Sequence, residues 1–191
     1  MNVYDFDNTI YRGESSLDLF FFYLRRHPSL VRYLPKALIG IIKYKLRMVP
    51  VDSLLNNYAI FAEDFFRNLG FEAIDRDMEI FWDKHMHKIK PFYRAQQKED
   101  DLIISASPEF FLQVLFKRIG IKNLIGTTVD KEKGKIEFVC FRENKIPAFQ
   151  CRYPDTMIEN FYTDSMNDKP LMDLAKNVFL VKGSRIKQIK P

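Results

Sequence analysis

The hydrophobic and polar positions of this 191-residue chain change their spacing along the sequence. Between residues 14 and 90, apolar side chains recur at helical intervals, with breaks at His27-Pro28-Ser29, at Val49-Pro50 and at Gly70. Outside this region, short apolar runs end in polar residues, which is typical of buried strands. The pattern therefore predicts a helical region placed within an α/β core.

The first region is expected to contain four helical segments. They cover residues 17–26, 30–46, 52–69 and 74–89. We expect Ser15 or Ser16 to cap the first of them and Asp52 or Ser53 to cap the third. Pro35 and Gly40 are expected to kink or divide the second.

The remaining residues predict alternating strands and helices. Strands are expected at residues 3–4, 102–104, 123–129, 135–141, 159–163 and 177–181, and helices at 107–120 and 169–176. The first of these helices opens at Ser107-Pro108, with Ser107 as its cap, and ends at Gly120. Residues 123–129 and 135–141 flank a charged turn and are expected to form a hairpin-like ribbon.

This alternation predicts a doubly wound, Rossmann-like parallel sheet with its site at the carboxyl edge of the strands. The expected division of the chain is an α/β core of residues 1–13 and 91–191, with an all-helical cap of residues 14–90 inserted after the first strand.

The composition fits a globular protein with a bulky core. Hydrophobic residues make up 47% and charged residues 29%, and 18 Phe and 9 Tyr predict an aromatic core or a large apolar pocket. Cys140 and Cys151 are the only cysteines, and they have no metal-ligand spacing, so a zinc site is not expected. Lone thiols, with no room for a leader before the first motif, favour a cytoplasmic location.

The charge is unevenly distributed. Residues 19–51 contain no acid, and the basic residues among them are Arg25, Arg26, Arg32, Lys36, Lys43, Lys45 and Arg47. The longest apolar run there, residues 38–42, is far short of the ~20 residues of a membrane span. Two interpretations stay open: peripheral contact with an anionic membrane, or a solvated face that steers small anions. No motif indicates nucleic-acid binding, and nothing indicates the oligomeric state.

Two carboxylates follow the first expected strand. In an extended segment Asp5 and Asp7 lie on the same face, with Phe6 turned the other way. Two unit charges ~4 Å apart at an effective dielectric of ~20 repel by roughly 4 kcal/mol. The pair therefore requires a cation or a shared proton.

The segment Asp5-Phe6-Asp7-Asn8-Thr9 resembles the first motif of the haloacid dehalogenase-like phosphohydrolases. The resemblance implies that Asp5 is a nucleophile and Asp7 a general acid/base, and that a small phosphorylated molecule is the substrate. Asn8 is taken as a phosphate-binding candidate and Thr9 as a support of the loop.

Three later segments resemble the other motifs of this family in the same order. Ser105 resembles the hydroxyl residue that holds phosphoryl oxygens, ahead of a helix whose first amides face an anion. Lys145 is chosen as the lysine that neutralises the nucleophile and the phosphate, although Pro147 interrupts its expected helix. Residues 164–168 resemble the fourth motif, with Thr163 where the family usually has Gly.

The resemblance also implies a Mg²⁺ cofactor. Oxygen ligands from Asp5, from Asp164 and from the backbone carbonyl of Asp7 suit this ion, which keeps several waters. Asp168 is expected to bind through water or to orient Lys145.

The helical cap resembles that of the phosphoserine-phosphatase-like subgroup in particular. The leading hypothesis is a magnesium-dependent phosphatase that hydrolyses a phosphomonoester, either a small metabolite or a lipid phosphate, through an aspartyl-phosphate. The alternatives are a phosphotransferase using the same intermediate and a catalytically idle anion- or membrane-binding protein with this fold.

Overall fold

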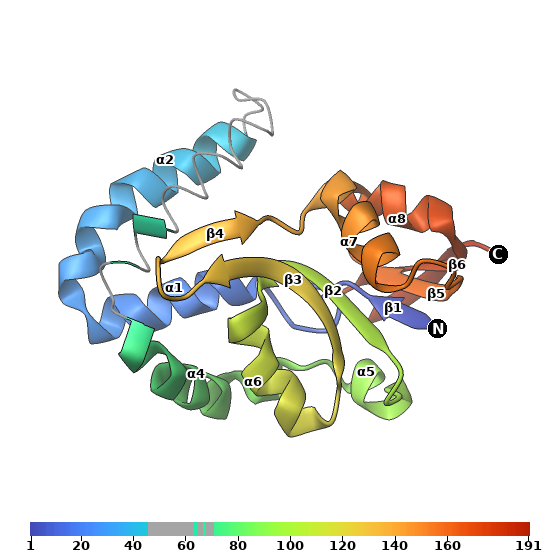
Figure 1. Ribbon diagram of the computed structural model, residues 1–191, viewed down its shortest axis with the longest axis horizontal. Helices are drawn as coiled ribbons and strands as arrows, with labels where there is room; N and C mark the ends of the chain where they lie inside the picture. Colours follow the sequence, from blue (N-terminus) through green and yellow to red (C-terminus); the bar gives the residue numbers. More distant parts are fainter. Residues whose placement is uncertain (46–62, 65–66, 68–70) are drawn as a thin grey trace.

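The computed structural model describes residues 1–45, 63–64, 67 and 71–191 (Figure 1). The described residues form a seven-stranded sheet in the order β4-β3-β2-β1-β5-β6-β7. The strands are β1 (Asn2–Tyr4), β2 (Leu102–Pro108), β3 (Asn123–Asp130), β4 (Lys135–Phe138), β5 (Ile158–Thr163), β6 (Ala175–Lys182) and β7 (Arg185–Lys190). The five inner strands are parallel, and β4 and β7 pair antiparallel at the two edges. The prediction of a largely parallel, doubly wound sheet is confirmed.

The helices flank this sheet on both faces (Figure 1). The α-helices are α1 (Ser15–Arg26), α2 (Leu34–Lys45), α4 (Phe71–His85), α5 (Pro91–Gln96), α6 (Glu109–Ile119), α7 (Lys145–Arg152) and α8 (Lys169–Leu174). Short 3₁₀ turns are η1 (Pro28–Tyr33), η2 (Met86–Lys88), η3 (Arg142–Asn144) and η4 (Met166–Asp168). No described helix has the length and apolar character needed to cross a membrane.

One face of the sheet is covered by an aromatic cluster. Phe6, Tyr11, Trp82 and Phe111 are fully buried there, and their rings meet edge-on or stacked. The Trp82 indole Nε1 donates to the Phe111 carbonyl oxygen at 2.7 Å and so joins α4 to α6. Side chains from the expected cap and from the α/β core therefore share one core, and the boundaries between residues 13 and 14 and between residues 90 and 91 stay a prediction.

The other face packs against α7 and α8. Its buried residues include Val3 on β1, Phe161 on β5, Phe149 on α7 and Leu171 on α8. The apolar positions of β1 thus alternate between two cores, because Val3 and Tyr4 belong to different clusters. This burial on both faces makes β1 the central strand.

The expected start of the first helix is wrong. Helix α1 begins at Ser15, its N-cap is Glu14, and no side chain caps it locally. The second expected helix is divided rather than kinked, because a 3₁₀ turn ends before Pro35, which is the second residue of α2. The third expected helix, with its cap at Asp52 or Ser53, lies almost wholly outside the described residues.

The edges of the sheet differ most from the prediction. Strand β7 was not predicted; it returns along β6 after Gly183, whose φ of 62° permits the turn. Strand β4 ends at Phe138 and helix α8 at Leu174, both earlier than expected. The β3–β4 ribbon itself is confirmed as an antiparallel pair.

Candidate active site

The carboxyl ends of three neighbouring strands meet at one edge of the sheet. Val3 on β1 pairs with Leu102 on β2 and with Phe161 on β5. Because these strands are parallel, the residues that follow them come to the same edge. Asp5 therefore leaves β1 beside the ends of β2 and β5, and its amide donates to the Tyr162 carbonyl oxygen at 2.9 Å.

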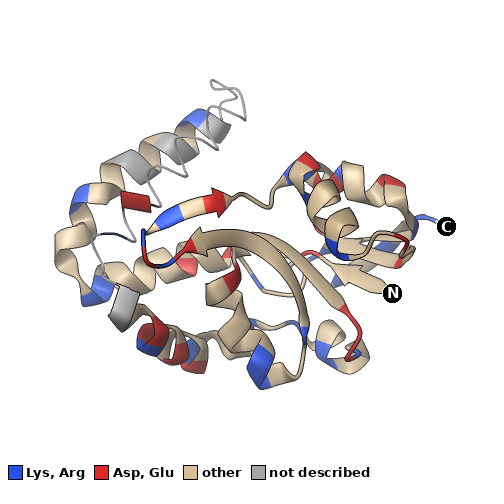
Figure 2. Cartoon of the chain, in the orientation of Figure 1, with Lys and Arg blue, Asp and Glu red and all other residues tan. Residues whose placement is uncertain are grey.

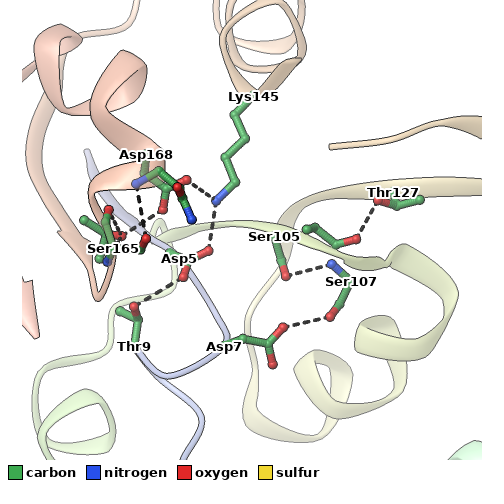
Figure 3. A network of polar contacts seen from close by, with 12 residues as sticks. Asp5, Asp7, Thr9, Ser105, Ser107, Thr127, Lys145, Ser165 and Asp168 are labelled. Atoms are coloured by element: carbon green, nitrogen blue, oxygen red, sulfur yellow. Dashed lines mark hydrogen bonds and ion pairs between the residues drawn. The ribbon is translucent and has the colours of Figure 1, made fainter. Parts of the chain in front are cut away.

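Lys145 lies between two carboxylates at this edge (Figure 3). Its Nζ is 2.9 Å from Asp5 Oδ1 and 2.7 Å from Asp168 Oδ1, and the residue is 2% exposed. It is the first residue of α7, so Pro147 falls in the first turn, where a missing amide costs no helical hydrogen bond. Pro147 thus starts this helix instead of interrupting it.

Thr163 replaces the usual glycine without disturbing the loop that follows β5. Its Oγ1 donates to Asp168 Oδ2 at 2.8 Å and accepts from the Ser165 amide at 3.2 Å. The Ser165 hydroxyl accepts from the Asn167 amide at 3.1 Å. Asp168 therefore contacts Thr163 through its Oδ2 and Lys145 through its Oδ1.

Asp7 is held through both of its carboxylate oxygens. Oδ1 accepts from the Ser15 amide at 2.6 Å, and Oδ2 accepts from the Ser107 hydroxyl at 2.9 Å. The expected capping by Ser107 is wrong, because Ser107 lies in the last residues of β2 and the N-cap of α6 is Pro108, with no side-chain bond. No local sequence pattern indicates this contact, since it joins residues 100 positions apart.

Ser105 is buried at the same end of β2. Its Oγ accepts from the Ser107 amide at 3.1 Å, which leaves its own hydroxyl hydrogen available as a donor. Helix α6 begins at Glu109, four residues further on.

Asn8 is turned toward the loop rather than toward the other predicted phosphate ligands. It has a positive φ of 58°, which asparagine tolerates, and its Nδ2 donates to Glu14 Oε1 at 2.5 Å. Among the described residues, no hydrogen bond joins it to Ser105 or Lys145. The buried Lys90, which the sequence analysis did not single out, donates from Nζ to the Asn8 carbonyl oxygen.

The carboxyl groups of Asp5 and Asp7 are held above their ordinary pKa. Burial raises the pKa of Asp5, with the Lys145 ammonium opposing and Asp168 adding to the rise. Burial also raises the pKa of Asp7, against hydrogen bonds from Ser15 and Ser107. Burial opposes the charged form of Lys145, but Asp5 and Asp168 more than offset this and raise its pKa. One ammonium group thus faces several carboxyls.

Two carboxyl groups at the rim of the site, Glu14 and Asp164, also have a raised pKa. Burial, then Asp7 and Asp164, raise the pKa of Glu14 to about 7. Burial raises the pKa of Asp164 too, with Lys182 opposing and Asp168 adding to the rise. The site therefore concentrates more negative charge than its described cations neutralise.

These residues fit a hard divalent cation in their chemistry. The donors are carboxylate and carbonyl oxygens, which Mg²⁺ prefers, and a bound cation would stabilise the ionised forms of Asp7 and Asp164, which burial disfavours. No three His, Cys, Asp or Glu side chains converge as a preformed metal site within the part of the chain that the structure describes. Mg²⁺ binds with few protein ligands and retains waters, so Asp5, Asp164 and the Asp7 carbonyl remain the residues that would hold it.

Residues 3–173 match the haloacid dehalogenase-like hydrolase family. None of the curated proteins matches the chain. Several solved structures share the fold, including the following three. A protein of unknown function from Bordetella pertussis Tohama I superposes with a TM-score of 0.71 at 18% identity, covering 91% of this chain and 85% of that one.

A phosphoserine phosphohydrolase-like protein from Francisella tularensis subsp. tularensis SCHU S4 gives a TM-score of 0.58 at 16% identity, covering 93% of this chain and 86% of that one. A HAD family hydrolase from Salmonella enterica subsp. enterica serovar Typhi gives 0.55 at 14% identity, covering 91% and 59% respectively. At such identities the likeness is one of fold.

Proposed function

The chain belongs to the haloacid dehalogenase-like hydrolases, and from this premise we propose that it is a magnesium-dependent phosphatase acting on a phosphomonoester through an aspartyl-phosphate on Asp5. The observation that carries the proposal is the position of Lys145 Nζ, 2.9 Å from Asp5 Oδ1 and 2.7 Å from Asp168 Oδ1. A buried ammonium that contacts a carboxylate at a strand end suits a nucleophile that must approach an anionic phosphate.

The first half-reaction transfers the phosphoryl group to the protein. A carboxylate oxygen of Asp5 attacks phosphorus, the bond from phosphorus to the ester oxygen breaks, and Asp7 gives its proton to the departing alcohol. Lys145 offsets the charge of Asp5 and of the transferred group, and Ser105 has a hydroxyl hydrogen available for a phosphoryl oxygen. A bound Mg²⁺ supplies charge neutralisation of the phosphoryl oxygens.

The second half-reaction restores the starting state. Asp7, now a carboxylate, takes a proton from a water molecule that attacks phosphorus, and the bond to Asp5 breaks. Inorganic phosphate leaves, and Asp7 again carries the proton that the next cycle requires. Asp168 keeps Lys145 beside Asp5 through both steps.

Substitution of Asp5 by asparagine tests the proposal. Asp5→Asn should abolish the release of phosphate from p-nitrophenyl phosphate in the presence of Mg²⁺, because the amide oxygen is a far weaker nucleophile. A cooperative thermal melt checks that the variant is folded. Turnover retained by the folded variant would overturn the assignment of Asp5.

A peripheral contact with an anionic membrane is part of the proposal. Helix α2 exposes Leu38, Ile39 and Ile42 by 54%, 53% and 53%. The sequence of η1 and α2 contains Lys and Arg residues but no Asp or Glu (Figure 2). An apolar face with cations beside it suits an anionic lipid surface, and a lipid phosphate presented there would be one substrate class. Cys140 and Cys151 are both free thiols, which supports the proposed cytoplasmic location.

A further inference from the structure

The Ser107 hydroxyl contacts three side chains at the end of β2 (Figure 3 shows its bond to Asp7). Its Oγ is 2.9 Å from Asp7 Oδ2, and it is 3.2 Å from both Ser15 Oγ and Ser16 Oγ on α1. Its own amide donates to Ser105 Oγ at 3.1 Å. The residue is 2% exposed, so water does not compete freely for these bonds.

The donor and acceptor capacity of a hydroxyl fixes the direction of these bonds. A serine hydroxyl has one hydrogen to donate and two acceptor positions. An ionised carboxylate only accepts, and in the protonated Asp7 of the first half-reaction Oδ2 still accepts when the proton lies on Oδ1, so in both states the Ser107 hydroxyl donates its single hydrogen to Oδ2. The Ser16 hydroxyl then donates to Ser107, and the Ser15 hydroxyl lies within reach of both Ser107 and Asp7.

The contact acts on the orientation of one particular carboxylate. The Ser15 amide holds Oδ1 of Asp7 and the Ser107 hydroxyl holds Oδ2, so the carboxylate plane is defined from two sides. Without Ser107, Asp7 would be held by Ser15 alone, through its amide and its hydroxyl, and the carboxylate would be less tightly oriented. A proton donor displaced by about 1 Å loses much of its effect on rate.

We infer that Ser107 is a positioning residue that aligns Asp7 with the leaving-group oxygen. The inference rests on the proposed function, since it assigns a residue to the step in which Asp7 protonates the departing alcohol. Ser107 touches neither Asp5 nor Lys145 in the described contacts, so in the first half-reaction it affects leaving-group protonation and not the attack of the nucleophile.

A comparison of two aryl phosphates of similar size separates the two steps. p-Nitrophenolate leaves readily without a proton, whereas phenolate requires one. In Ser107→Ala, kcat/KM for phenyl phosphate, which reports only the steps up to departure of the leaving group, should fall by at least ~10-fold, within the range that general acid catalysis supplies. The value for p-nitrophenyl phosphate should fall by less than about threefold, so the ratio of the two rates widens.

Two further variants control for structure. Thr127→Val removes another buried hydroxyl at the same end of β2, since Thr127 Oγ1 donates to the Ala106 carbonyl oxygen at 2.6 Å, but it has no bond to Asp7. Its ratio should match that of the wild type. Ser107→Thr keeps a hydroxyl and should return the ratio toward the wild type. Ser107→Cys, close in shape and a weak donor, replaces the alanine variant if that one does not fold.

The outcomes distinguish this inference from the proposed function. If wild-type protein hydrolyses neither ester, the proposed function fails. If the wild type is active and Ser107→Ala lowers both rates equally or leaves the ratio unchanged, the positioning assignment is wrong. A widened ratio in Thr127→Val would also contradict it, because the effect would then belong to the end of β2 and not to Asp7.

Discussion

The contacts of single residues account for the chemistry of the site. Lys145 is buried between Asp5 and Asp168, so its removal leaves two carboxyls without their cation. Its place in the sequence suggested a resemblance to the third family motif, but only the fold brings it 140 residues back to Asp5. The role of Ser107 could not be predicted from neighbouring residues. Serine before proline is typical of a helix cap, but the Ser107 hydroxyl donates to the carboxylate of Asp7 instead.

Lys145→Met should abolish turnover and lower the free energy of unfolding by about 3–5 kcal/mol, because it leaves buried charge unpaired. Adding Asp168→Asn removes one of the stranded carboxyls. The double variant should therefore be more stable than Lys145→Met alone while remaining inactive. Urea unfolding of Lys145→Met, Asp168→Asn and the double variant measures the stabilities; a loss in the double variant equal to the sum of the two single losses would show that the pair is not coupled.

Thr163→Val should destabilise the loop after β5 by about 1.5–3 kcal/mol, the range for a hydrogen bond to a charged group. The methyl group that replaces the hydroxyl neither donates to Asp168 nor accepts from the Ser165 amide. Thr163→Ser, which keeps the hydroxyl, is the matched control and should lie near the wild type. Thermal melting of both variants decides, and equal melting temperatures would contradict the assigned bond.

At the scale of elements, the packing of β3 against the start of α6 decides how the end of β2 is held. Strand pairing from β2 to β3 shifts register between Ile104 and Pro108. A Cβ at Gly126 would lie 2.8 Å from the Ser107 carbonyl oxygen and 2.9 Å from Glu109 Cγ. Glycine is therefore required here by space and not by backbone angle.

Gly126→Ala should destabilise the protein by about 1–3 kcal/mol, the usual cost of overpacking. It should also widen the leaving-group ratio described for Ser107→Ala, because the Ser107 backbone has to move. Gly120→Ala cannot serve as the matched control for Gly126→Ala, since Gly120 has a φ of 76° and open space around it. If Gly126→Ala leaves both the stability and the ratio of the two ester rates unchanged, β3 can move away from Ser107 without affecting the site, and the prediction is wrong.

The face of α2 makes a prediction about membranes. Charge reversal at Arg32, Lys36, Lys43 and Lys45 should abolish co-sedimentation with vesicles containing an anionic phospholipid, each cation near such a surface contributing about 1 kcal/mol. Vesicles of neutral phospholipid are the control and should retain little of the wild-type protein. Binding that is insensitive to both changes would exclude an electrostatic membrane contact.

Element boundaries were predicted less well than element types. The ends of α1 and α8 involve long-range hydrogen bonds that no local sequence pattern indicates. The Ser15 amide donates to Asp7 at the start of α1, and Lys190 Nζ donates to the Met172 and Asp173 carbonyl oxygens at the end of α8. Strand β7 is exposed along almost its whole length and lacks the apolar alternation that marks a half-buried strand. The buried strand β2 was found because its first three residues, Leu102, Ile103 and Ile104, form a continuous apolar run.

At the scale of the whole molecule, the sheet order explains why distant segments form one site. Strand β1 lies between β2 and β5, so residues near positions 5, 105 and 164 reach one edge although they are far apart in sequence. The parallel class of the sheet followed from strand–helix alternation. The excess of carboxyl groups at that edge could not be predicted from the sequence, because only the structure shows that the described cations there do not balance them.

Mg²⁺ should therefore stabilise the folded chain as well as activate it. Saturating Mg²⁺ after removal of metal by a chelator should raise the melting temperature and restore phosphate release, since binding to the native state alone favours that state. Asp164→Asn should lose most of the thermal shift. A full shift in that variant would remove Asp164 from the metal ligands.

The central claim is that Asp5 carries the phosphoryl group during turnover. Its most direct test is to quench the protein in acid during the hydrolysis of p-nitrophenyl phosphate and to locate any phosphate by peptide mass spectrometry. The account predicts a phosphorylated peptide with the modification on Asp5, more abundant in Asp7→Asn, which cannot activate water, and absent in Asp5→Asn. Turnover with no such adduct in either wild type or Asp7→Asn, or an adduct on another residue, would contradict it.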